Sequence, residues 1–283
     1  MIKIEFQNLI LKGDSKKAFR DPACIYHNGV YHLFYTLSSK KDGYMYNRIA
    51  KSESVDFEKW SEPVFLTKED NLWNFCSPGN ILKVGDEFIM CVSSYPMPLP
   101  FEEVCAADDT ARLFIMRSKD LKTWSEPEKI HIGGELSKGK RKIDPFILPD
   151  KDENGKYHLF FKQDGKINRA ISKSDILNWE YVSDVIDGEN PCIVVEDNKY
   201  LMFYSPSNGV KTLVSEDLVS WDEKGKIHFD DEILKWASGR ITAGFMMDTP
   251  HDGGKALFFH GSVSGVFPET HGDASIGVIK YEN

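Results

Sequence analysis

The sequence predicts an all-β protein, a five-bladed β-propeller whose blades are four-stranded antiparallel sheets. One strand–turn–strand unit returns five times along the 283 residues, and four copies close on an aspartate that precedes a tryptophan by four positions. No apolar period of 3.6 residues, which a helix would show, is sustained anywhere. Repeats of about 40–60 residues that each hold four strands are typical of propellers. We therefore expect residues 1–283 to form a single propeller domain.

Each repeat begins with an apolar strand, a tight turn and an aromatic-rich strand. The first copy contains "ACIYHNGVYHLFYT" and the third contains "PFILPDKDENGKYHLFFK". The turns HNGV, VGDE, ENGK and EDNK supply the Asn, Asp and Gly residues that tolerate positive φ in a hairpin. Val, Ile, Phe and Tyr are frequent on both sides of these turns, as they are in strands.

A third strand and a loop with aspartate and tryptophan complete each of the first four repeats. The pairs are Asp56 and Trp60, Asp120 and Trp124, Asp175 and Trp179, and Asp217 and Trp221. We expect these tryptophans to pack blades together rather than to bind a ligand. The fifth copy ends before such a loop, so we predict that the N-terminal "IKIEFQNL" supplies its outer strand and closes the ring. An open β-sandwich is the alternative, and the regular spacing argues against it.

Composition and charge exclude several classes of function. Hydrophobic residues make up 41% and charged residues 28% of the chain, which is ordinary for a globular protein. The net charge of −9 gives no basic footprint for nucleic acid or an anionic membrane. A neutral or cationic substrate is therefore expected rather than a polyanion. No run approaches the roughly 18 apolar residues that span a bilayer.

The cysteines and the start of the chain predict a cytoplasmic protein. The five cysteines are odd in number, scattered and never spaced as C-x-x-C, so we expect reduced thiols. The first residues lack a basic head followed by an apolar stretch of signal-peptide length. A secreted protein without its leader would show the same pattern.

Three acidic residues stand at equivalent places in repeats one, three and four. Asp21 lies in "FRDPACIY", Asp144 in "KIDPFILP" and Glu189 in "GENPCIVV", each one or two residues before a proline. Proline pushes the residue before it towards extended geometry, so we expect each carboxyl group to point in a defined direction. A single Asp-Pro pair usually marks a simple turn, but three in phase with the blades indicate a shared site.

In a propeller the first strand of each blade lines the central channel, so these three acids are predicted to converge at one end of it. Converging carboxylates repel one another, which raises the pKa of at least one. Such a site can hold a carboxylic acid and a carboxylate together at neutral pH, as glycoside hydrolysis requires.

The three motifs resemble those of glycoside hydrolase family 43 and related five-bladed glycosidases. In that family a blade-one Asp is the general base, a blade-three Asp tunes and orients the acid, and a blade-four Glu is the general acid. The resemblance implies that Asp21 activates a water, Glu189 protonates the glycosidic oxygen and Asp144 sustains the raised pKa of Glu189. It also implies an inverting hydrolase of arabinose-, xylose- or galactose-type linkages in short oligosaccharides, with no cofactor.

Two alternatives remain open. Retaining fructosidases of family 32 share the frame but usually carry Asn-Asp-Pro-Asn in blade one and Arg-Asp-Pro in blade three. This chain has Arg20-Asp21-Pro22 and Ile143-Asp144-Pro145 at these places. The second alternative is a non-catalytic carbohydrate-binding propeller, although a binder could lose any of the three acids without penalty.

Five further residues are predicted to contact the sugar. Blade two begins "LWNFCSPGN", which places Trp73, Phe75 and Ser77 near the channel mouth, where aromatic faces could stack on a sugar ring. In blade five, Arg240 is expected to bind substrate hydroxyls or to restrain Asp144, and His260 ends the second strand.

Three other features carry weaker expectations. No spacing is typical of a zinc site, although the resemblance allows a structural calcium in the channel. Arg20 should face away from Asp21 if the strand is extended, while Lys162 and the two residues after it are predicted to line a subsite. The long insertion at 95–112 should form a rim loop that walls the pocket or meets a partner subunit. The sequence predicts no oligomeric state.

Overall fold

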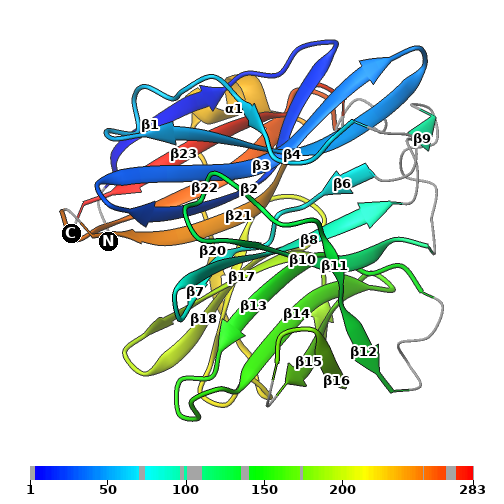
Figure 1. Cartoon of the computed structure of the whole chain (residues 1–283). Coiled ribbons are helices and arrows are strands. Elements are labelled where there is room, and N and C mark those ends of the chain that lie inside the picture. The colour runs from blue at the N-terminus through cyan, green and yellow to red at the C-terminus, as the bar shows by residue number, and fades with distance from the viewer. Residues whose placement is uncertain are drawn as a thin grey trace.

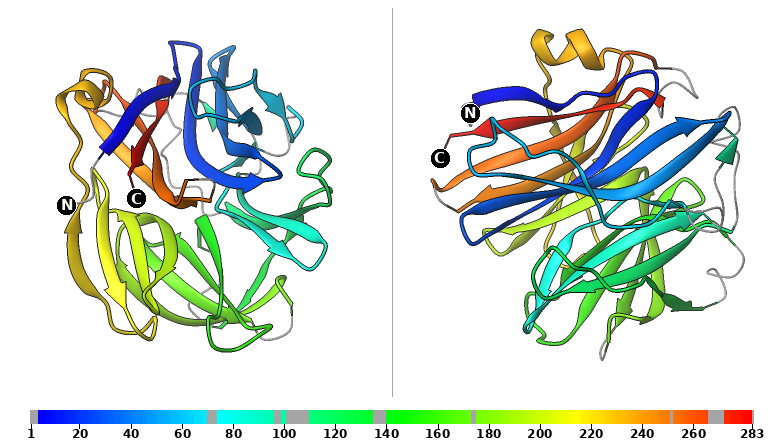
Figure 2. Two further views of the ribbon diagram at one scale, coloured as in Figure 1. Left: turned by 90° about the vertical axis from the view of Figure 1, so that its left-hand side faces the viewer. Right: turned by 45° about the horizontal axis from the view of Figure 1, so that its top comes forward.

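The computed structural model describes residues 4–69, 74–95, 99–100, 110–134, 140–172, 175–250, 252–265 and 272–282. Five sheets surround a common centre, which confirms the predicted five-bladed propeller (Figure 2, left). Strands are numbered along the chain (Figure 1). Within the described residues, no helix is long and apolar enough to cross a membrane.

Each blade is mainly antiparallel, and its first strand is the innermost. Blade one contains β2 (Lys17–His27), β3 (Val30–Lys41), β4 (Tyr44–Ser54) and β5 (Val64–Phe65), with β9 (Leu99–Pro100) beside β4. Blade two contains β6 (Asn74–Cys76) and β7 (Ile81–Val84), which both pair with β8 (Glu87–Tyr95), then β10 (Arg112–Ser118) and β11 (Glu128–Lys129). Blade three contains β13 (Ile143–Pro149), β14 (Tyr157–Gln163), β15 (Lys166–Ser172), β16 (Asn178–Asp187) and a parallel outer strand, β12 (His131–Gly133).

The last two blades close the ring. Blade four contains β17 (Glu189–Glu196), β18 (Lys199–Ser205), β19 (Lys211–Ser215) and β20 (Asp222–Lys226). Blade five contains β21 (Arg240–Thr249), β22 (Gly254–Ser262), β23 (Ser275–Tyr281) and the N-terminal β1 (Ile4–Leu11). Strand β1 runs antiparallel to β23 with Gln7 opposite Ile279, as predicted for the outer strand of the fifth blade. The helix α1 (Asp231–Ala237) lies between blades four and five in the chain.

The repeated aspartate and tryptophan pack blades one, two and four against the blade before each of them. The Asp56 carboxylate accepts hydrogen bonds from the main-chain N–H groups of Glu58 and Lys59 at 2.9 and 3.0 Å, and the other three aspartates make the same turn. This turn directs the tryptophan at an aromatic ring of the preceding blade, which confirms its packing role. The ring pairs are Trp60 with Phe258, Trp124 with Phe34 and Trp221 with Phe160, with centroids 6.1, 5.6 and 6.5 Å apart.

A bulge, or in blade two the break between β6 and β7, interrupts the innermost strand of every blade at the same place. The residue at the bulge has positive φ although it is not glycine, and the five residues are Asp21, Ser77, Asp144, Asn190 and Ala243. The sequence predicted extended geometry for the acids before proline, and this was wrong for Asp21 and Asp144, whose φ angles are 53° and 54°. Bulges with left-handed residues re-aim side chains and are frequent beside functional sites.

Hydrogen bonds between neighbouring blades fix four of these five bulges. The main-chain N–H of the bulge residue donates to a side chain on the second strand of the preceding blade. The donor–acceptor pairs are Ser77 to Thr36 Oγ1 (2.7 Å), Asp144 to Ser93 Oγ (3.1 Å), Ala243 to Ser205 Oγ (2.9 Å) and Asp21 to His260 Nδ1 (3.0 Å). We call these four contacts the bulge latches. They satisfy buried N–H groups and hold the strained residues in register.

Candidate active site

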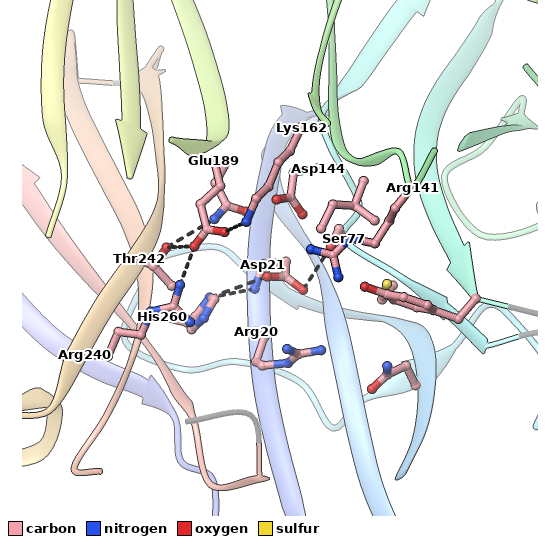
Figure 3. Close-up of a pocket in the computed structure, with 15 residues that line it drawn as sticks. Arg20, Asp21, Ser77, Arg141, Asp144, Lys162, Glu189, Arg240, Thr242 and His260 are labelled. Atoms are coloured by element: carbon pink, nitrogen blue, oxygen red, sulfur yellow. Dashed lines mark hydrogen bonds and ion pairs between the residues drawn. The ribbon is translucent and has the colours of Figure 1, made fainter. Parts of the chain in front are cut away.

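The three predicted acids line one cavity at the end of the channel. The described residues enclose about 200 Å³, and Asp21 on β2, Asp144 on β13 and Glu189 on β17 all contribute to its wall (Figure 3). Asp21 and Asp144 are only 9% and 8% exposed. Segments far apart in the sequence therefore bring three carboxyl groups together in a space with little water.

Asp21 is held by hydrogen bonds within its own blade and with both neighbouring blades. Its Oδ2 accepts a hydrogen bond from Thr36 Oγ1 at 2.7 Å and lies 3.4 Å from Ser77 Oγ. Its main-chain N–H donates to His260 Nδ1, so this nitrogen carries no proton. Burial, together with the charges of Arg20 and Arg240, holds the pKa of His260 well below its usual range. The neutral imidazole therefore positions Asp21 and does not form an ion pair with it.

The carboxyl group of Asp144 tends to stay protonated. Burial, and after it the negative charge of Glu189, raise its pKa to about 7, and Asp21 adds to this while Lys162 opposes it. Near neutral pH the cavity can therefore hold a carboxylic acid beside a carboxylate, which is the combination that acid–base catalysis needs.

Glu189 lies between two cations. Its Oε2 accepts a hydrogen bond from Lys162 Nζ, and its Oε1 accepts one from Arg240 Nη2. Thr242 Oγ1 lies 3.5 Å from the same Oε1 and itself accepts from Asn190 Nδ2 at 3.1 Å. Arg240 was predicted to restrain Asp144 or to bind substrate hydroxyls; the structure pairs it with Glu189, and the binding of hydroxyls stays a prediction.

Lys162 occupies the position at which the other blades carry a latch acceptor. It stands opposite Ile143 in the register of blade three, as Ser205 stands opposite Glu189 in blade four. A lysine ammonium donates hydrogen bonds and cannot accept one. Blade three therefore contributes a cation to the cavity where its neighbours contribute an acceptor to the ring.

The other predicted sugar contacts have different fates. Ser77 lines the cavity, as do Arg240 and His260. Phe75 packs in the hydrophobic core against Phe114, with ring centroids 5.6 Å apart, and is not among the described residues that line the cavity. Its expected stacking on a sugar is therefore not supported. Trp73 lies outside the described residues, as does most of the insertion at 95–112.

Two arginines line the cavity although the sequence analysis did not predict this: the orientation of Arg20 was predicted wrongly, and Arg141 was not considered. Arg20 was predicted to face away from Asp21, yet both line the cavity, because the positive φ of Asp21 breaks the alternation of an extended strand. Arg141 lies three residues before Asp144 and also lines the cavity. Its place in "RKIDP" was the available signal. Among the described residues no group of three or more His, Cys, Asp or Glu could hold a metal ion; the channel calcium stays a prediction.

Comparisons with known proteins bear on this arrangement. No protein-family model matches the sequence, and no curated protein is significantly similar to it. Solved structures, in contrast, superpose over almost the whole chain. The fold is that of the family 43 and family 62 glycosidases.

Three of these structures show the extent of the likeness. A thermostable family-43 glycoside hydrolase has a TM-score of 0.67 at 14% identity, covering 93% of this chain and 89% of its own. The catalytic domain of the GH62 alpha-L-arabinofuranosidase of Coprinopsis cinerea has a TM-score of 0.68 at 13% identity, covering 97% and 95%. A protein solved as an RGII complex reaches 0.73 at 14% identity, covering 99% and 92%. At these identities the likeness shows the fold, and the activity rests on the chemistry of the cavity.

Proposed function

We propose that the protein is a glycoside hydrolase that cleaves terminal sugar units from short oligosaccharides. The observation that carries the proposal is the convergence of Asp21, Asp144 and Glu189 in one cavity, with the pKa of Asp144 raised to about 7. The shared fold with family 43 and family 62 glycosidases supports it. Arabinose-, xylose- and galactose-type linkages are the first substrates to try.

In the proposed mechanism Asp21 is the general base. Thr36 and Ser77 both contact its Oδ2, so among the described side chains its Oδ1 receives no hydrogen bond and can take the proton of an attacking water. Water attacks the anomeric carbon as the glycosidic bond breaks, and the configuration inverts in a single displacement. Such a pair of acid and base stands roughly 6.5–9.5 Å apart, which leaves room for the water.

Glu189 is the proposed general acid, and its ion pairs define what substrate entry must change. A carboxylate held by both Lys162 and Arg240 cannot donate a proton to a leaving group while it keeps both contacts. We therefore propose that the glycosidic oxygen replaces one of the two cations. Asp144 is buried beside Glu189, and the two carboxyl groups titrate as a pair. When Asp144 is ionised, its negative charge favours the protonated form of Glu189; when it is protonated, it can pass its proton to Glu189 during turnover.

The small cavity favours action at a chain end. Sites for drug-sized ligands usually enclose about 300–1,000 Å³, whereas the described residues here enclose about 200 Å³. A space of this size suits one sugar unit.

The first test is a panel of nitrophenyl glycosides of arabinose, xylose, galactose and fructose, with the released anomer followed by proton NMR. We expect turnover of at least one pentoside or galactoside and release of the inverted anomer first. First release of the retained anomer would favour the fructosidase-like alternative. The doubly ion-paired Glu189 is the one observation that favours a non-catalytic binding propeller; saturable sugar binding with no turnover across the panel would establish that alternative.

A further inference from the structure

The cavity contains more cationic side chains than acidic ones. The chain has a net charge of −9, yet Arg20, Arg141, Lys162 and Arg240 all line this one cavity. Glu189 forms ion pairs with both Lys162 and Arg240, although its single negative charge balances only one of them. The charge balance inside the cavity is therefore the reverse of that of the whole protein, from which the sequence predicted a neutral or cationic substrate.

The remaining two cations have no partner among the described side chains of the cavity. In the part of the chain that the structure describes, neither Arg20 nor Arg141 makes a hydrogen bond or an ion pair with another side chain there. Arg20 is only 7% exposed, and its Nε is buried without any acceptor. A guanidinium group carries five donors and stays charged, so burying it unpaired is costly unless a ligand or water completes the site.

Arg20 and Arg141 also lie near one another. The charges of both act on the hydroxyl group of Tyr95, where they oppose the larger effect of burial on its pKa. Tyr95 itself lines the cavity. In Figure 3 both guanidinium groups lie on the side of Asp21 away from Glu189 and Arg240. The cavity thus has an acid–base side and, across Asp21, a side with two uncompensated donors.

We propose that Arg20 and Arg141 bind an oxyanion on the substrate, so that the enzyme acts on an acidic sugar or on a sugar joined to one. A planar guanidinium matches a carboxylate through two parallel hydrogen bonds, and sulfate or phosphate esters offer the same oxygen geometry. A sugar carboxylate is the simplest such group, because it stands on the ring itself and fits a cavity sized for one unit. This inference rests on the proposed glycosidase function for turnover, although the binding site does not depend on catalysis.

The test is isothermal titration of the wild-type protein with galacturonate, galactose 6-phosphate and galactose. We expect galacturonate, or the phosphate ester if that is the source of the oxyanion, to bind at least about tenfold tighter than galactose, since hydrogen bonds between charged groups are stronger than those to a neutral hydroxyl. Raising the salt concentration should reduce the difference in affinity between the acidic sugar and galactose. Equal affinity for all three ligands would overturn the proposal.

Arg141→Gln and Arg20→Gln identify the residues. Each should lower the affinity for the acidic sugar by about tenfold or more and leave that for galactose within about twofold. Arg117→Gln, at a surface ion pair with Glu87, is the matched control and should change neither. Arg141 is half-buried and its variant should fold even if that of Arg20 does not. Equal losses for acidic and neutral sugars would contradict an oxyanion site. Selective acid binding without turnover of any glycoside would instead leave this site standing and refute the hydrolase.

Discussion

Four blades and blade three use the same position on the second strand differently. In four blades Thr36, Ser93, Ser205 and His260 accept a hydrogen bond from the bulge of the next blade and so hold the ring, and Thr36 and His260 thereby also position Asp21. In blade three the position is Lys162, which contacts Glu189 instead. The difference shows how one repeat can separate scaffold from site: the same backbone frame carries an acceptor for stability or a cation for chemistry.

The largest expected effect is a loss of turnover when Glu189, the residue that Lys162 of blade three contacts, is replaced. Glu189→Gln removes the proposed proton donor and should lower kcat by about 10²–10⁴. The variant should still fold, but its melting temperature should fall somewhat, because the amide has one oxygen and can accept from Lys162 or from Arg240 but cannot keep both contacts. Glu58→Gln, on an exposed loop, is the matched control. A Gln variant with wild-type kcat on a hydrolysed glycoside would remove Glu189 from the mechanism.

The next effect is a pH dependence of stability that Asp144 causes. Its pKa is raised to about 7 in the folded protein, so between about pH 4 and 7 the folded state binds more protons than the unfolded chain. Stability from this group is therefore present at low pH and is lost as the pH rises through about 7.

Asp144→Asn removes that dependence. Urea unfolding at pH 5 and pH 8 should show that the variant gains stability relative to wild type on going to the higher pH, by at most about 3 kcal/mol. Parallel curves for the two proteins would mean that the acid is not held neutral by the cavity.

A smaller effect on stability should come from the bulge latches. Ser205→Ala leaves the buried N–H of Ala243 without its acceptor and should destabilise the fold by about 1–3 kcal/mol. The exposed Ser207→Ala serves as control, and denaturant midpoints provide the measurement. If both variants unfold at the wild-type midpoint, the latches do not hold the ring.

The smallest stability effect is expected at Lys162. Lys162→Met keeps the length of the side chain, and Arg240 still compensates Glu189, so the free energy of unfolding should change by less than about 1 kcal/mol. Turnover should nevertheless fall about tenfold, because the carboxylate is then fixed from one side only. A variant that loses stability and keeps kcat would make Lys162 a scaffold residue like Ser205.

The repeat pattern sufficed to predict the ring and the convergence of the acids, because both depend on which strand each residue begins. The hairpin turns and the contribution of β1 to blade five followed from local residue types in the same way. The direction of the Arg20 side chain could not be predicted in this way, because it depends on the left-handed bulge at Asp21. A hydrogen bond to His260 in another blade holds that bulge. The pairing of Lys162 with Glu189 joins two blades and has no local signature.

The central claim is that Asp21 activates water in a site built by three blades. The turnover of Asp21→Asn on the best substrate of the panel tests it most directly, with the exposed hairpin variant Asp197→Asn as control. We predict that Asp21→Asn loses at least about 10²-fold in kcat at an unchanged melting temperature, while the control keeps wild-type activity. Wild-type turnover by a folded Asp21→Asn protein would contradict the account.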